Sequence, residues 1–338
     1  MKTVTVSACL SLVLAATLAG CASDSPGDGD TSNDAASPGT GTQITNCGAT
    51  LTITEPPQRA LAMEQNATEI LLSLGLADRM IGTSYQTDPV LPELADDYAD
   101  VPVLADLYPN REAVLDAAPD FVYSTFTSAY GPDAAGARAD LAALDIPAYL
   151  SRFACEDPAT GEAEVDFDGI FAEITEIATI FGVAERGEQL VAEQRARLDA
   201  ATSSAAGQSS ADTDLLWYYS GTATPYVAGS GGLPAAISAR LGVTNAYGDA
   251  DQTWPAGSWE DIAARNPDVI VLADLTRGGD GDSAQSKIDF LRGNPTTAQL
   301  DAVKAGRFIT VSGSSMDPSV RSVTAVEAVA AGLKELTD

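Results

Sequence analysis

Histidine is absent from this chain of 338 residues, and basic side chains of any kind are scarce. Without histidine the chain cannot form a Ser–His–Asp or Cys–His catalytic centre, a histidine-ligated zinc or haem site, or a histidine-based pH switch. The 18 Lys and Arg residues are opposed by 48 Asp and Glu, which gives a formal net charge of −30. A surface of this charge repels phosphate backbones and anionic lipid head groups, so nucleic acid is not an expected partner.

Long hydrophobic runs are also lacking, apart from one at the N-terminus. Residues 4–18 are largely apolar, follow Lys2 and precede a short Ala-Gly-Cys sequence that ends at Cys21. This pattern predicts a secretory signal peptide over residues 1–20, because the apolar stretch is shorter than the roughly 20 residues of a membrane span. The ending resembles a bacterial lipobox, in which cleavage precedes a cysteine that is then lipidated. The alternative is an ordinary signal peptide followed by an unrelated cysteine.

The segment after the signal peptide has the composition of a linker. Residues 21–46 are almost wholly Ser, Gly, Asp, Thr, Pro, Ala and Asn, which cannot bury a core and predict a flexible tether. We therefore expect an exported protein on the extracytoplasmic face of the cell membrane, attached to the membrane only through the lipid on Cys21.

Four cysteines are present, and two remain after export. Cys9 lies in the signal peptide and Cys21 is expected to carry lipid, which leaves Cys47 and Cys155. In an oxidising compartment a structural disulfide between them is the default expectation. The alternative is a pair of unpaired, buried thiols, and no cysteine spacing suits a metal or redox site.

The rest of the chain has the composition and length of a globular protein with two domains, since hydrophobic residues make up 45%. Short β-rich runs alternate with helical patterns, which predicts parallel α/β sheets. We expect an N-terminal α/β lobe over 47–165, a long linker helix over 166–210 whose pattern is interrupted near Gly182, and a C-terminal α/β lobe over 211–338. The predicted strands cover 59–63, 80–84, 120–124, 146–150, 215–219, 225–228, 269–272 and 308–311.

An internal repeat supports two similar lobes. Asn110 precedes Glu112 by two residues, and Ser258 precedes Glu260 by two; both small polar residues are candidate helix N-caps. In both copies a Pro-Asp pair follows the glutamate by seven and eight residues, and an apolar strand comes next. Each copy therefore predicts a short helix, a turn and a buried strand.

From about Arg59 to the C-terminus the sequence resembles the periplasmic-binding family that delivers ferric siderophores, haem or vitamin B12 to ABC importers. The resemblance lies in the order and spacing of short segments, none of which is specific alone. It implies an α/β fold of class III, two Rossmann-like lobes joined by a single long helix, with ligand held between the lobes. The matching segments are 68–70, 74–75, 78–82, 118–122, 144–147, 226–229, 266–270 and 302–307.

The resemblance also implies a role for the repeated glutamates. In the family, one glutamate on each lobe docks onto arginines of the permease, and Glu112 and Glu260 match those positions. Two carboxylates on separate lobes suit a basic partner surface. The alternative is that each glutamate only stabilises a helix N-terminus through the helix dipole, and both roles are compatible.

Ligands of open α/β sheets bind at the carboxyl ends of the strands, so the loops after the predicted strands hold the candidate ligand contacts. Tyr85 falls where B12-binding relatives present a tyrosine, and Trp254 matches an aromatic position on the opposite lobe. Aromatic faces and a few arginines suit a large planar or anionic ligand, such as a catecholate or carboxylate siderophore. The candidates are Glu64, Gln65, Asn66, Tyr85, Phe126, Tyr130, Tyr219, Trp254, Arg277, Met316 and Arg321.

The expected function is therefore capture of an iron(III)–siderophore complex by a monomeric binding protein that works with an ABC permease and its ATPase. We expect no catalytic residues, no resident metal and no intrinsic cofactor. The first alternative ligand is a corrinoid or another bulky anionic cofactor; a free metal ion held by Glu64 and a second carboxylate is a weaker one. An exported carboxylate-dependent hydrolase and a surface adhesion protein are the remaining alternatives, although the chain has no G-x-S-x-G elbow or P-loop.

Overall fold

The structure is a computed structural model that describes residues 41–157, 161–162, 164–205, 212–279 and 281–337. Residues 40–338 form one compact unit. The signal peptide, Cys21 and most of the predicted tether lie outside the described residues. The tether prediction extends too far, however, because residues 42–46 form a strand.

The N-terminal lobe is built on a five-stranded parallel sheet in the order β5-β4-β3-β6-β7. Its central strands β3 and β6 are buried on both faces, which explains why their sequences are largely apolar rather than alternating. The strands are β3 (Ala60–Ala62), β4 (Met80–Ser84), β5 (Val103–Ala105), β6 (Phe121–Ser124) and β7 (Ala148–Leu150). The helices are α1 (Gln65–Ser73), α2 (Ala95–Tyr98), α3 (Arg111–Asp116) and α4 (Arg138–Ala142), with short 3₁₀ turns at Ala77–Arg79, Pro92–Leu94, Thr127–Tyr130 and Arg152–Ala154.

The C-terminal lobe has a second five-stranded sheet in the order β11-β10-β13-β14, with β12 also pairing with β10. All pairs are parallel except β10 with β11. The strands are β10 (Asp214–Ser220), β11 (Tyr226–Val227), β12 (Thr244–Asn245), β13 (Val269–Asp274) and β14 (Phe308–Ser312). The helices are α7 (Leu233–Leu241), α8 (Trp259–Arg265), α9 (Ala284–Gly293), α10 (Asp301–Ala305) and α11 (Ser322–Thr337), with 3₁₀ turns at Thr297–Gln299 and Gly313–Met316.

Two helices, not one, occupy the predicted linker: α5 (Phe167–Ile180) and α6 (Ala184–Ala205). The chain turns at Gly182, whose φ of +67° lies in the left-handed region that favours glycine. The two helices are antiparallel, because Arg195 of α6 pairs with Asp168 at the start of α5 at 2.7 Å. The interruption seen in the sequence pattern is therefore a reversal of the chain.

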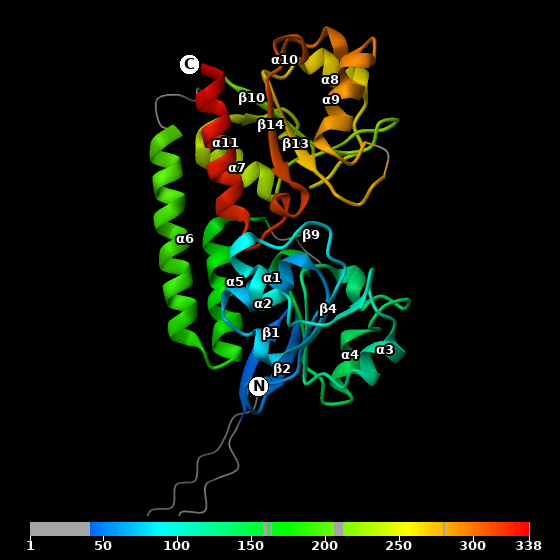
Figure 1. Cartoon of the computed structure of the whole chain (residues 1–338), viewed down its shortest axis with the longest axis vertical. Helices are drawn as coiled ribbons and strands as arrows, with labels where there is room; N and C mark the ends of the chain where they lie inside the picture. The colour runs from blue at the N-terminus through cyan, green and yellow to red at the C-terminus, as the bar shows by residue number, and fades with distance from the viewer. Residues whose placement is uncertain (1–40, 158–160, 163, 206–211, 280, 338) are drawn as a thin grey trace, which may run out of the picture. The chain divides into compact units, whose positions relative to one another are not determined.

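Helix α6 connects the lobes (Figure 1). Near its start, the Arg186 guanidinium donates to the carbonyl oxygens of Leu74 and Gly75 in the N-terminal lobe. Further along, the Arg197 guanidinium donates to the Glu327 carboxylate of α11 at 2.6 and 3.0 Å. A helix of 22 residues is about 33 Å long, which is enough to run beside both sheets.

The internal repeat is visible as two equivalent helix–turn–strand units. Asn110 and Ser258 cap α3 and α8, because each side chain accepts a hydrogen bond from the backbone N–H three residues later. Ala118 and Asn266 come directly before the Pro-Asp pair in each turn, with φ of +50° and +45°. In each unit the Asp of the Pro-Asp pair then accepts backbone N–H groups from the neighbouring strand segment: Asp120 from Gln58 and Arg59, and Asp268 from Asp214. The repeated aspartate thus helps to hold two parallel strands in register.

A disulfide joins Cys47 to Cys155. Cys47 lies in the turn between β1 (Thr42–Asn46) and β2 (Ala49–Ile53), which pair antiparallel, and Cys155 precedes a small hairpin of β8 (Glu156–Asp157) and β9 (Gly161–Glu162). The bond spans 108 residues and attaches the N-terminal hairpin to the first lobe. A loop of this length corresponds to about 4–5 kcal/mol in the chain-entropy description.

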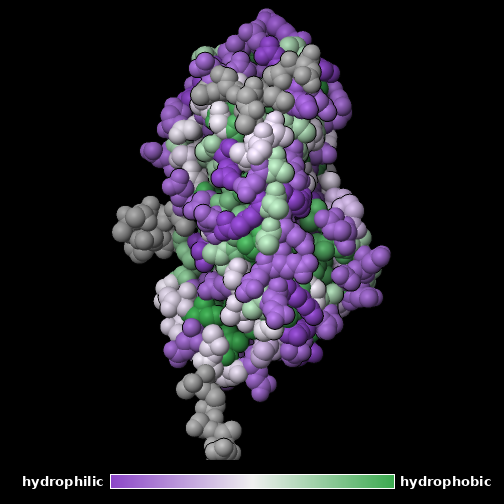
Figure 2. All heavy atoms as spheres, turned by 90° about the vertical axis from the view of Figure 1, so that its left-hand side faces the viewer, coloured by the Kyte–Doolittle hydropathy of each residue, from purple (hydrophilic) through white to green (hydrophobic). Residues whose placement is uncertain are grey.

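The side of the molecule that carries α6 is mainly polar at its surface (Figure 2). Among the residues that the structure describes, no helix combines the length and apolar character needed to cross a membrane.

Candidate functional site

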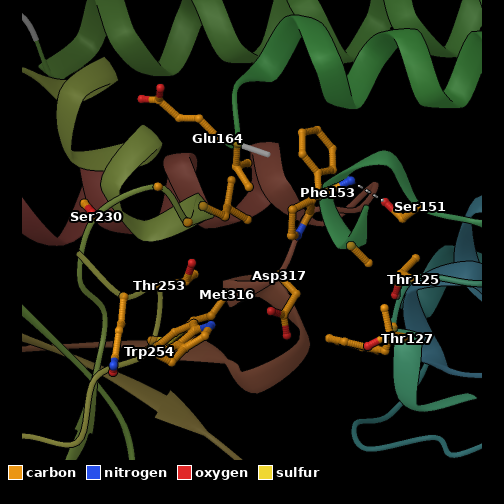
Figure 3. Close-up of a pocket in the computed structure, with 18 of the residues that line it drawn as sticks. Thr125, Thr127, Ser151, Phe153, Glu164, Ser230, Thr253, Trp254, Met316 and Asp317 are labelled. Carbon is orange, nitrogen blue, oxygen red and sulfur yellow. Dashed lines mark hydrogen bonds between the residues drawn. The ribbon is translucent and has the colours of Figure 1, made fainter. Parts of the chain in front are cut away.

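The carboxyl ends of the strands in both sheets border a cleft with two adjoining cavities, of about 430 and 1060 Å³. The loops after β3, β4, β5, β6 and β7 supply the N-terminal side. The end of β10 and the loops after β11, β12, β13 and β14 supply the C-terminal side. Phe126, Trp254 and Asp317 line both cavities. Figure 3 shows the larger one, with the Asp317 side chain between Met316 and Trp254 on one side and Thr125 and Thr127 on the other.

Nine of the eleven candidates for ligand contact line these cavities. The smaller cavity is lined by Glu64, Gln65, Asn66, Tyr85, Phe126, Tyr219, Trp254 and Arg277. The larger one is lined by Met316, together with Phe126 and Trp254. Met316 itself is 1% exposed, so it forms the floor of the larger cavity and presents little surface.

Tyr130 and Arg321 lie outside both cavities. The Tyr130 ring packs in the core of the N-terminal lobe, and its hydroxyl donates to the Tyr149 carbonyl oxygen at 2.6 Å. The Arg321 guanidinium is 6% exposed and forms an ion pair with Glu69, whose side chain is fully buried. Arg321 was a candidate because it lies in the loop after a predicted strand, where a base was expected to face the ligand. In the structure it instead compensates a buried acid.

Sequence reasoning missed several polar and aromatic residues of the cleft. Tyr108 follows β5, a strand of three residues that is too short to give a clear pattern. Tyr226 was assigned only to a strand, yet it is 47% exposed and lines the smaller cavity. Asp317 directly follows the candidate Met316, so its place in that loop was the available signal. The other lining residues outside the eleven candidates include Thr87, Ser128, Ser220 and Ser314 at the smaller cavity, and Phe153, Glu164, Asp251 and Thr253 at the larger one.

Glu64 is a buried carboxylate at the N-terminal end of α1. It accepts hydrogen bonds from the Ser124 hydroxyl at 2.7 Å, the Thr125 amide at 2.6 Å and the Thr125 hydroxyl at 3.0 Å. Burial raises the pKa of the Glu64 carboxyl from 4.5 to about 7, although these hydrogen bonds act in the opposite direction. Glu64 therefore changes charge close to neutral pH.

The raised pKa predicts a specific dependence of stability on pH. Below pH 4.5 Glu64 is protonated in both folded and unfolded chains, and between pH 4.5 and 7 only the folded chain keeps the proton. Its contribution to the free energy of unfolding is thus present below about pH 4.5 and is lost as pH rises through about 7. In urea titrations, we expect the unfolding free energy of wild type minus that of Glu64→Gln to fall as pH rises across this window.

Ser124→Ala provides the matched control for this measurement. It removes a hydroxyl that stabilises the ionised carboxylate, so the window should move to higher pH. Parallel stability profiles for wild type and Glu64→Gln from pH 4 to pH 8 would show that burial does not perturb this carboxyl.

Aromatic rings line both sides of the smaller cavity. Tyr85 and Tyr108 of the N-terminal lobe meet edge to face at 4.8 Å between ring centroids, and Tyr219 and Trp254 of the C-terminal lobe lie 5.0 Å apart. Tyr85 has a φ of +48°, a left-handed conformation that is costly for a tyrosine and places strain at the cleft. The cleft thus presents broad π faces from both lobes.

Direct bonds connect the lobes beside the cleft. The amide of Ser314 donates to the Asp88 carboxylate at 2.7 Å, and the Thr276 hydroxyl donates to the Thr87 carbonyl oxygen at 2.5 Å. The ion pair of Arg321 with Glu69 adds a third, buried connection. These bonds hold together the loops on which the cavity residues stand.

The two repeated glutamates lie on the surface and away from the cavities. Each is the second residue of its helix, α3 or α8, and each is exposed. Figure 1 shows α3 and α8 on the side of the molecule away from α6. Within the described part of the chain, no cluster of three or more Cys, Asp or Glu is arranged to hold a metal ion.

Comparison with known proteins decides the family. Residues 61–314, three quarters of the chain, match the family described as periplasmic binding protein. The chain belongs to the periplasmic binding protein family. Members of this family are extracytoplasmic substrate-binding proteins of transport systems, not enzymes, and the two α/β lobes are those of its class III fold.

Three known proteins illustrate the similarity. A vitamin B12-binding protein of Vibrio campbellii (strain ATCC BAA-1116) is 26% identical over 236 residues, which cover 70% of this chain and 78% of that protein. The crystal structure of a periplasmic binding protein from Veillonella parvula DSM 2008 is 28% identical with a TM-score of 0.76, covering 88% of this chain and 98% of that one. An ABC-type Fe3+-hydroxamate transport system structure from Saccharomonospora viridis DSM 43017 shares the fold at 22% identity, with a TM-score of 0.71 and coverage of 86% and 98%.

Proposed function

We propose that this periplasmic binding protein captures a ferric siderophore in the cleft and delivers it to an ABC permease with its ATPase. The observation that carries the proposal is the cleft itself: two adjoining cavities of about 430 and 1060 Å³ lined by aromatic rings from both lobes. Phe126 and Tyr226 are 37% and 47% exposed there, so their rings are accessible to a ligand in the cleft.

The same proposal includes anchoring and docking. Cleavage before Cys21 and lipidation of that cysteine keep the protein at the outer face of the cell membrane. Glu112 and Glu260, one on each lobe, dock onto arginines of the permease. Their exposure and their equivalent positions in the repeat support this role.

A corrinoid is the second candidate ligand, and the similarity to the vitamin B12-binding protein of Vibrio campbellii favours it. Tyr85 and Trp254, which line the smaller cavity from opposite lobes, support stacking on a large ring system equally well.

Titration of the purified protein with ferric siderophores, haem and cobalamin, followed by tryptophan fluorescence, tests the proposal. Trp254 lines both cavities, whereas Trp217 and Trp259 are 0% and 6% exposed. We expect saturable quenching by a ferric siderophore and recovery of the ligand chemically unchanged. The quenching amplitude should fall in Trp254→Phe and persist in Trp217→Phe, whose indole donates to Ser238 within the core. Saturable binding of cobalamin alone, or turnover of the ligand, would contradict the proposal.

A further inference from the structure

The charge of the cleft is opposite to what an anionic ligand requires. Four acidic residues line the two cavities, Glu64, Glu164, Asp251 and Asp317, against one basic residue, Arg277. Arg277 is not available as a free cation, because its guanidinium bonds to the buried Asp282 carboxylate at 2.8 Å. The described lining of the cleft is therefore net negative.

Asp317 stands at the centre of this negative charge. It is half-buried and lines both cavities, and among the described residues its carboxylate has neither a hydrogen bond nor an ion pair. Burial raises the pKa of the Asp317 carboxyl to about 7 because no neighbour compensates the lost water. A carboxylate in this position is stabilised when a ligand brings a positive charge to it.

Two unpartnered polar atoms in the smaller cavity also point to a ligand. The Asn66 side-chain oxygen and the Ser314 hydroxyl have no hydrogen-bond partner, although these residues are only 2% and 6% exposed. Both residues line the cavity together with Asp317. The amide oxygen of Asn66 can only accept a hydrogen bond, so an N–H group of a ligand can satisfy it.

The aromatic rings that line the smaller cavity also favour a positively charged ligand. The faces of Tyr85, Tyr108, Tyr219 and Trp254 carry negative electrostatic potential and attract cations. Arg277 already uses one of them, with its guanidinium carbon 5.8 Å from the centroid of the Tyr219 ring. Carboxylates, an acceptor oxygen and π faces are the groups that typically surround organic ammonium ligands.

We propose that the cleft selects, among ferric chelates, those that carry a pendant ammonium group, and rejects trianionic ferric catecholates. In this arrangement the ammonium lies near Asp317, and N–H groups of the ligand can donate to Asn66. The inference rests on the proposed capture of a ferric siderophore and replaces the anionic ligand expected from the sequence with a cationic one.

Three ferric complexes test the inference by isothermal titration calorimetry: a linear tris-hydroxamate with a free primary amine, the same chelate with the amine acetylated, and a tris-catecholate. Acetylation removes the positive charge and leaves the iron centre unchanged. We expect the ammonium form to bind at least ten times more tightly than the acetylated form, and the catecholate to bind weakest. Equal affinities for the first two, or tightest binding of the catecholate, would overturn the inference while leaving siderophore capture intact.

Asp317→Asn identifies the responsible carboxylate. The substitution is nearly isosteric, and it should reduce the preference for the ammonium form to about threefold or less. Its affinity for the acetylated chelate, which reports on correct folding, should remain within about threefold of wild type. Asp116→Asn is the matched control, since Asp116 is an exposed residue of α3 that lines neither cavity, and it should keep the preference. If Asp317→Asn keeps the full preference for the ammonium form, the assignment to Asp317 is wrong. If the protein binds cobalamin but none of the ferric chelates, both this inference and the proposed function are overturned.

Discussion

Arg321→Met should lower the free energy of unfolding by about 3–5 kcal/mol, because it leaves the Glu69 carboxylate buried without its countercharge. The two side chains are 6% and 0% exposed. Arg321 also donates to the Pro89 carbonyl oxygen at 2.7 Å and to the Ser312 hydroxyl at 3.2 Å. Glu69 in turn accepts from the Gln65 side chain and the Leu91 amide, so loss of the arginine disturbs a fully bonded group. Equilibrium unfolding in urea measures the effect.

Two further variants serve as controls for this measurement. The double variant Glu69→Leu with Arg321→Met removes both charges, so it should recover much of the lost stability. Asp140→Ala breaks the exposed ion pair with Arg111, whose side chains are 41% and 60% exposed, and should cost no more than about 1 kcal/mol. An equally small loss for Arg321→Met would mean that the buried pair contributes nothing beyond a surface pair.

Glu112→Ala combined with Glu260→Ala should reduce transport at least tenfold while ligand affinity stays within about twofold of wild type. Both carboxylates are exposed and outside the cavities, so we expect their removal to affect the proposed docking and not ligand capture. The loss of two helix-dipole interactions should cost about 0.3–1 kcal/mol each. Uptake of radiolabelled iron by cells that depend on this binding protein, compared with calorimetric affinity, measures the two effects separately.

A second double variant serves as the matched control, because it removes the same number of negative charges from the same two lobes. Asp116 in α3 and Asp289 in α9 are also exposed, and their double replacement by alanine should leave transport unchanged. Normal uptake by the Glu112 and Glu260 double variant would contradict docking and leave only the helix-capping role. Reduced uptake by both double variants would instead show that total negative charge, and not the two glutamates, is what the permease recognises.

Much of the fold could be predicted because its signals are local. The Pro-Asp repeats lead into β6 and β13, and both strands lie at the predicted places because buried parallel strands form largely apolar runs. Short or two-residue strands such as β5 and β12 could not be predicted, since so few residues give no periodicity. The hairpin of β1 and β2 was missed because its first strand, with the sequence TQITN, resembles the polar segment before it.

For the candidate site, too, one part could be predicted from the sequence and another could not. Loops after strands were identified correctly as the lining of a cleft, because strand ends define where loops converge in any open α/β sheet. Which side chains reach the cleft depends on partners distant in sequence: Arg321 is paired with Glu69, 252 residues away, and Tyr130 with the Tyr149 carbonyl. No local pattern contains that information.

The sequence by itself determined the two α/β lobes, the repeated helix–turn–strand unit and the absence of any histidine chemistry, because composition and short-range spacing carry these properties. Only the tertiary structure decided that the linker reverses at Gly182 and that one rare arginine neutralises a buried glutamate. It also decided that Asp317 lines both cavities without a hydrogen bond or ion pair from the described residues, and the proposed preference for a cationic ligand rests on this placement. These features depend on contacts between residues that are distant in sequence, and only the packed chain brings such residues together.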